Sequence, residues 1–214
     1  MPFLKGVYLF SIAVALVFSI TEGHRHRTSV RRLTFLLGYM LTSEITGFVL
    51  EYRGLDKHFL HYVYTPIEVL FLCYLYAAHY ASALLGKVVR IAAWSFLGFS
   101  VVYGVRLWID TGWLVSPTTL IAGEWVLIIF LVLYYFYDLY RNDYLLSLNR
   151  QPLFWISVGN FFFYSGTFFL MALFPHLEQQ NSAQADRLFA MNTILNIFMY
   201  IFWAIGFLCL RLTI

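Results

Sequence analysis

Long apolar runs alternate with short polar connections along the whole chain. Seven of these runs are each close to the ~20 residues that an α-helix needs to cross a ~30 Å hydrocarbon core. They cover residues 3–20, 33–52, 59–82, 88–109, 117–140, 152–174 and 188–211. The pattern predicts an all-α integral membrane protein, a bundle of seven transmembrane helices that forms a single polytopic domain over residues 1–214.

The composition supports a membrane protein and excludes an ordinary soluble globule. Hydrophobic residues make up 61% of the chain and charged residues 12%, and the mean hydropathy is +0.74. The first run carries its positive charges after the apolar residues instead of before them, so we expect a retained helix and not a cleaved signal peptide. Too few residues lie between the runs to form a soluble catalytic domain.

The distribution of lysine and arginine predicts the orientation in the membrane. Nine basic residues fall on one side, namely Arg25, Arg27, Arg31, Arg32, Lys87, Arg90, Arg141, Arg150 and Arg211, and five on the other, namely Lys5, Arg53, Lys57, Arg106 and Arg187. The positive-inside rule therefore places the N-terminus outside and the C-terminus in the cytoplasm. We expect the cluster at 25–32 to contact membrane lipids, and we expect no nucleic-acid partner.

Three glutamates lie inside the apolar runs and mark the positions where function is expected. They are Glu44, Glu68 and Glu124. A charged side chain near the middle of a membrane costs roughly 3 kcal/mol or more, so each carboxyl group needs a reason to be there. At 1.5 Å per residue, Glu44 lies about 12 Å and Glu124 about 10 Å below the outer end of its helix. The sequence predicts that Glu44 and Glu124 face a shared cavity that opens outward.

Other polar residues at similar depth complete the predicted ligand-binding site. Asn192 and Asn196 are one turn apart on one face of the seventh helix, about 6 and 12 Å below its outer end. Arg106 lies in the outer turn of the fourth helix. With two or three carboxyl groups against one arginine, the site is expected to bind a small cation, an amine or a proton.

The place of Glu68 has two interpretations. If the third helix starts at Phe59, Glu68 lies about 14 Å deep and belongs to the site. The segment from Thr65 to Glu68 also fits a capping box with proline at the first helical position. In that interpretation the helix begins at Pro66 and Glu68 is a helix cap.

We expect no enzyme activity, because no pair of nucleophile and base, no metal-ligand set and no cofactor motif is present. The predicted function is a ligand-sensing or receptor-like module that acts through a membrane signalling partner. The alternative is a proton- or cation-coupled transporter of a small molecule. Glu44 and Glu124 are 80 residues apart, a spacing that suits two inverted repeats of three helices and favours the alternative.

Two stretches and one asparagine carry a resemblance. They are Tyr64-Thr65-Pro66-Ile67-Glu68, Pro152-Leu153-Phe154-Trp155-Ile156-Ser157-Val158-Gly159 and Asn196 in the last run. In these stretches, which cover under a quarter of its length, the chain resembles an uncharacterised group of short seven-helix bacterial membrane proteins. The resemblance implies location in a bacterial inner membrane and carries no activity.

Overall fold

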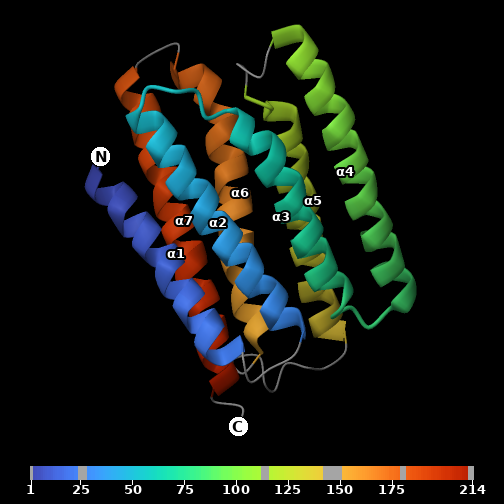
Figure 1. Ribbon diagram of the computed structural model, residues 1–214. Coiled ribbons are helices and arrows are strands. Elements are labelled where there is room, and N and C mark those ends of the chain that lie inside the picture. Colours follow the sequence, from blue (N-terminus) through green and yellow to red (C-terminus); the bar gives the residue numbers. More distant parts are fainter. Residues whose placement is uncertain (1, 24–27, 112–115, 142–150, 179–181, 212–214) are drawn as a thin grey trace. The chain divides into compact units, whose positions relative to one another are not determined.

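The computed structural model describes residues 2–23, 28–111, 116–141, 151–178 and 182–211. These residues form seven helices (Figure 1). The helices are α1 (Pro2–Gly23), α2 (Thr28–Tyr52), α3 (Phe59–Ala77), α4 (Ala83–Thr111), α5 (Thr118–Arg141), α6 (Pro152–Glu178) and α7 (Ser182–Arg211). Each is long and apolar enough to cross a membrane. The prediction of seven helices of membrane-spanning length is confirmed for this part of the chain.

The end of α3 differs from the prediction. The apolar run suggested a helix to residue 82 and a connection at 83–87, whereas α3 ends at Ala77 and α4 already begins at Ala83. Residues 78–82 form the turn, in which the Tyr80 hydroxyl donates to Leu131 O at 2.8 Å and the Ala81 N–H to Asp138 Oδ2 at 3.0 Å. These bonds to α5 stop the helix within an apolar stretch, so hydropathy alone could not locate its end.

The connection before α7 is also shorter than predicted. We expected a polar loop over residues 175–187, but α6 continues to Glu178 and α7 starts at Ser182. A polar segment adopts a helix when neighbouring turns already supply the nucleus, because each added residue then gains a backbone hydrogen bond. The loop prediction was wrong for the helical part of this segment, and residues 179–181 lie outside the described residues.

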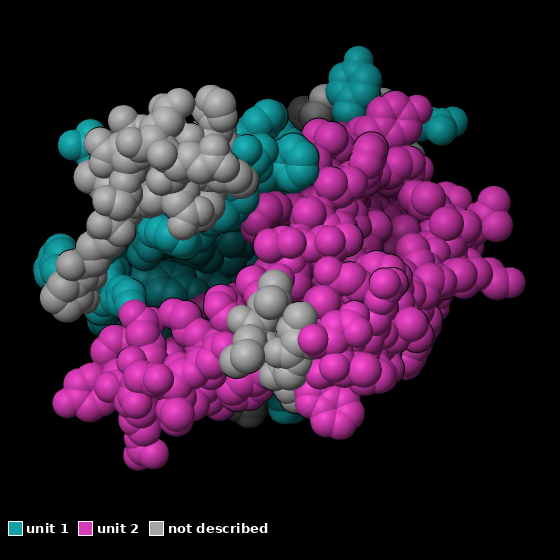
Figure 2. All heavy atoms as spheres, turned by 90° about the horizontal axis from the view of Figure 1, so that it is seen from above, with its two compact units in different colours: residues 1–37, 139–214 teal, residues 38–138 magenta. Residues whose placement is uncertain are grey.

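The chain divides into two compact units (Figure 2). One consists of residues 1–37 and 139–214, and the other of residues 38–138. The helices α2 and α5 each contribute to both units. The prediction of a single polytopic domain stays a prediction.

In the first unit, α7 packs against both α1 and α6. Glycines allow α6 and α7 to approach closely: a Cβ atom on Gly159 would lie 2.9 Å from Phe202 Cβ, and one on Gly206 would lie 2.8 Å from Pro152 O. The indole N–H of Trp203 donates to Asn160 Oδ1 at 2.9 Å, where both side chains are fully buried. Small residues and interhelical hydrogen bonds are the usual basis of helix association in membranes.

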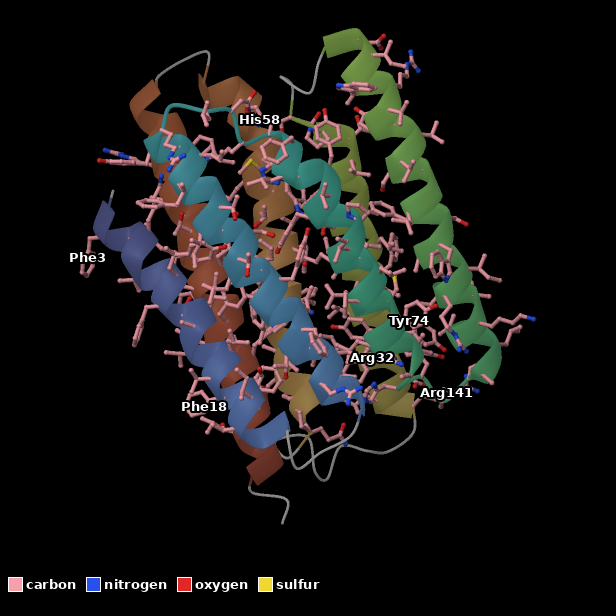
Figure 3. The ribbon with its side chains drawn as sticks, in the orientation of Figure 1. Phe3, Phe18, Arg32, His58, Tyr74 and Arg141 are labelled. Carbon is pink, nitrogen blue, oxygen red and sulfur yellow. The ribbon has the colours of Figure 1, made fainter. Side chains whose placement is uncertain are left out.

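In the second unit, α3 packs against α4 and runs parallel to α5. The two helices run in the same direction because residues further along α3 contact residues further along α5. Glu68 at the middle of α3 meets Glu124 in the first third of α5, and further along both helices the rings of Tyr76 and Tyr135 lie 5.9 Å apart. The indole N–H of Trp94 on α4 donates to Tyr74 Oη at 3.0 Å, near the end of α3 opposite to His58 (Figure 3).

Large apolar side chains are exposed on every helix. Examples on α1 are Phe3 and Phe10, and Figure 3 shows Phe3 and Phe18 projecting from the same side of that helix. The second unit exposes Val101, Val102 and Ile109 along α4. A soluble protein rarely exposes apolar surface of this extent, because each exposed apolar area carries a hydration cost.

Candidate functional site

Two glutamates from different helices meet in the interior of the second unit. Glu68 of α3 and Glu124 of α5 form a side-chain hydrogen bond. Each residue is only 3% exposed. Thr65, which is 1% exposed, also forms a side-chain hydrogen bond with Glu124. We call Glu68 and Glu124 the carboxyl pair.

The sequence of α3 explains why Thr65 and Glu68 reach the same partner. Residues three apart on a helix share a face. The residues of α3 that are buried follow this spacing, with Thr65, Glu68, Leu72 and Tyr76 among them. The buried face of α3 therefore carries Thr65 and Glu68 up to the middle of the helix, and apolar or aromatic side chains beyond it.

The structure decides between the two interpretations of Glu68. The helix α3 begins at Phe59, and Pro66 lies inside it. Glu68 is therefore not a cap of the first turn, and the capping-box interpretation was wrong. The proline lacks an N–H, so it removes one backbone hydrogen bond from the helix two residues before Glu68.

The hydrogen bond within the carboxyl pair determines its minimum proton content. An ionised carboxylate only accepts hydrogen bonds, whereas a protonated carboxyl group can also donate one. A hydrogen bond between Glu68 and Glu124 thus requires at least one proton on the pair.

One oxygen of the pair has unused hydrogen-bonding capacity. Among the buried side-chain oxygens and nitrogens of the described residues, only Oε1 of Glu124 has no hydrogen-bond partner. A buried polar atom without a partner loses roughly 1–3 kcal/mol relative to one that is satisfied. Such an atom in a native structure commonly marks a position where a proton, a water or a ligand completes the site.

The middle of α2 contributes two contacts of Tyr39 beside the pair. Tyr39 lies within electrostatic reach of Glu68 and forms a side-chain hydrogen bond with Ser43. The rings of Tyr39 and Tyr64 are stacked, with centroids 5.9 Å apart and planes inclined by 14°. Tyr64 is four residues before Glu68, and residues at this spacing share a helix face. Aromatic faces and carboxyl groups therefore gather at one place in the unit.

Glu44 occupies a different face of α2. Tyr39 and Ser43 are four residues apart and mark the face that meets Glu68, and Glu44 is turned about 100° from Ser43 around the helix axis. Glu44 is half-buried. The structure brings Glu68 into direct contact with Glu124. The outward-facing cavity shared by Glu44 and Glu124 stays a prediction.

The remaining predicted residues lie elsewhere. Arg106 has an exposed side chain (81%), and its Nε lies 3.8 Å from Asp110 Oδ2, so it is not brought to the carboxyl pair. Asn192 accepts a hydrogen bond from the Thr167 hydroxyl at 2.7 Å, and the Asn196 side chain donates to Asn192 O at 3.2 Å. Both asparagines belong to the first unit. Their participation in one site with the glutamates stays a prediction.

Sequence reasoning missed three contributors to the site, which are Tyr39, Ser43 and Tyr64. One sequence-based interpretation treated Thr65 as part of a helix cap. The spacing of three residues between Thr65 and Glu68 nevertheless indicated that both lie on one face of the helix. No comparable signal existed for Tyr39, since sequence spacing says nothing about which face of α2 meets α3.

No family model matches the chain, and no curated protein or solved structure matches it. Within the described residues, no group of three or more His, Cys, Asp or Glu side chains is placed to hold a metal ion.

Proposed function

We propose that the chain is an integral membrane protein that couples the movement of a small molecule to proton or cation binding at the carboxyl pair. The observation that carries the proposal is the hydrogen bond between Glu68 and Glu124, which are each 3% exposed. Ionisable residues inside membrane-spanning segments are costly, and they mark ion pathways and proton relays in transporters. A pair that gains and loses a proton within the membrane is what a coupled transporter needs.

Insertion into a membrane is supported by the seven apolar helices and by their exposed side chains, which lipid chains would cover. The proposed orientation has the N-terminus outside and the C-terminus in the cytoplasm, as the nine-to-five distribution of basic residues favours. The proposed location is a bacterial inner membrane, which the sequence resemblance favours. Reporter fusions after Ile214 and within residues 179–185 test the orientation, and an extracytoplasmic signal from the C-terminal fusion would reverse it.

Ligand sensing through a membrane partner is the second candidate. The stacked rings of Tyr39 and Tyr64 beside Glu68 favour it, because aromatic faces and a carboxyl group together bind cationic ligands. A sensor uses this arrangement to detect a ligand without moving it. Transport is preferred because a sensor has no need for a proton shared between two buried carboxyl groups.

A liposome assay distinguishes the two candidates. The purified protein is reconstituted into vesicles that contain a pH-sensitive dye, and a panel of amines, amino acids, sugars and inorganic cations is added outside. We expect one class of solute to cause proton movement in the wild type. In Glu124→Gln this coupling should disappear, because the amide cannot exchange a proton.

The matched control is Glu51→Gln. Glu51 is an exposed glutamate whose carboxylate lies 2.6 Å from Lys57 Nζ at the surface of the same unit. Its variant should retain full coupling. A folded wild type that moves protons with none of the solutes would refute transport and leave ligand sensing, and undiminished coupling in Glu124→Gln would remove the pair from the mechanism.

A further inference from the structure

We infer that the ligand of the carboxyl pair is a small primary ammonium ion, and that its binding releases one proton from Glu68 and Glu124. The inference rests on the proposed function in that it names the class of molecule taken at the same site. It starts from Oε1 of Glu124, which is buried and has no hydrogen-bond partner.

The hydrogen-bonding groups of the site match those of a primary ammonium ion. Such an ion, like the end of a lysine side chain, has three N–H donors and no acceptor. The site offers acceptors of three kinds: the free Oε1 of Glu124, the carboxyl oxygens of Glu68 and the hydroxyl oxygen of Thr65. An ammonium ion bound here would satisfy the unpartnered oxygen and form charge-assisted hydrogen bonds, which are stronger than neutral ones.

Charge balance sets the stoichiometry of the exchange. The groups that act on Glu124 are Glu68 and Thr65, and neither is cationic. A buried site of low dielectric strongly disfavours an uncompensated charge. Binding of one cation is therefore accompanied by the loss of one proton: the O–H bond of one carboxyl group breaks, the proton leaves to water, and the carboxylate that remains balances the ammonium charge.

Two tyrosines lie near the pair. Tyr39 on α2 is within electrostatic reach of Glu68, and Tyr64 on α3 stacks on Tyr39. Glu44 follows Ser43 on α2 and lies on a different face of that helix. Aromatic rings attract cations without carrying a charge, so these two rings would add to the attraction for a cation. A quaternary ammonium ion can use these rings but has no N–H donor for the carboxyl groups.

Binding is measured by calorimetry on the purified full-length protein in nanodiscs. The ligands are methylammonium, ethylammonium, tetramethylammonium, sodium and potassium chlorides, in phosphate and in HEPES, since Tris is itself a primary amine. We expect methylammonium and ethylammonium to bind at least tenfold more tightly than the other three. Their apparent Kd should fall about tenfold per unit of rising pH, and the dependence of the heat on the buffer should correspond to one proton released.

Three variants separate the carboxyl pair from its surroundings. Glu124→Gln should weaken methylammonium binding at least tenfold and remove its pH dependence, whereas Thr65→Val should weaken binding a few-fold and keep the pH dependence. Glu51→Gln should match the wild type. If Glu124→Gln does not fold, as judged by circular dichroism and gel filtration, the comparison of methylammonium with tetramethylammonium in the wild type still decides.

Several results would overturn the inference. The first is that tetramethylammonium or an inorganic cation binds as tightly as methylammonium. The second is that the affinity for methylammonium does not change with pH, and the third is that methylammonium does not bind at all. Methylammonium binding without solute-coupled proton flux in vesicles would refute transport and keep the inference. Proton-coupled movement of a solute that is not an amine, with no methylammonium binding, would refute the inference and keep transport.

Discussion

Replacing Gly159 with alanine tests the close approach of α6 and α7. The new Cβ atom would lie 2.9 Å from Phe202 Cβ, 3.0 Å from Met199 O and 3.3 Å from Met199 Cα. These are backbone or Cβ atoms, which cannot move by changing a side-chain rotamer. The two helices therefore have to separate locally, and overpacking of this kind costs roughly 1–3 kcal/mol.

Alanine also favours the helix, so part of this cost is offset. The helix propensity of alanine exceeds that of glycine by about 1 kcal/mol. We expect Gly159→Ala to lower the free energy of unfolding by a net of about 1 kcal/mol. The measurement is equilibrium unfolding by titration of SDS into detergent micelles, followed by far-UV circular dichroism.

Two other glycines provide graded controls for this reasoning. A Cβ atom on Gly166 would lie only 2.6 Å from Leu195 Cδ1, but that atom is the end of a flexible side chain. Gly166→Ala should therefore cost less than Gly159→Ala in spite of the shorter distance. Gly98 has nothing within 4 Å of the added atom, so Gly98→Ala should be neutral or stabilising. A Gly166→Ala variant less stable than Gly159→Ala, or a harmless Gly159→Ala, would refute the reasoning.

Two further predictions concern buried hydrogen bonds. Burial raises the pKa of the Tyr80 phenol above its ordinary value of 10.0, with smaller contributions from neighbours such as Tyr76. The stabilising contribution of neutral Tyr80 is therefore complete below about pH 10 and is lost as the pH rises further. Tyr80→Phe should be about 1 kcal/mol less stable than the wild type at pH 8, and this difference should shrink by about 1 kcal/mol between pH 10 and pH 11. The same SDS titration at several pH values measures it, and a difference that does not change with pH would contradict the prediction. Asn160→Leu should cost about 1 kcal/mol by leaving the Trp203 N–H without its acceptor, and Asn160→Leu with Trp203→Phe should recover part of that loss. A double variant less stable than the single one would contradict this account.

The sequence by itself determined the secondary structure well, because apolar length is a direct physical signal. A run near 20 apolar residues has few alternatives to a helix when its backbone groups must be satisfied internally. The start of α6 at Pro152 was also predictable, since proline suits the first helical position. The end of α3 at Ala77 was not, because the bonds of Tyr80 and Ala81 to α5 determine it.

The sequence also identified carboxyl groups within the apolar helices as the candidate site, but it could not show which of them touch. It favoured a cavity shared by Glu44 and Glu124, which stays a prediction, and the structure places Glu68 in direct contact with Glu124. Depth along a helix follows from residue number, whereas rotation about the helix axis does not. In an apolar helix the side chains that face neighbouring helices and those that remain exposed are alike in hydropathy, so the pattern contains no signal for rotation. The tertiary packing of α3 against α5 decided which carboxyl groups meet, and the stacking of Tyr39 on Tyr64 decided which aromatic rings lie beside them.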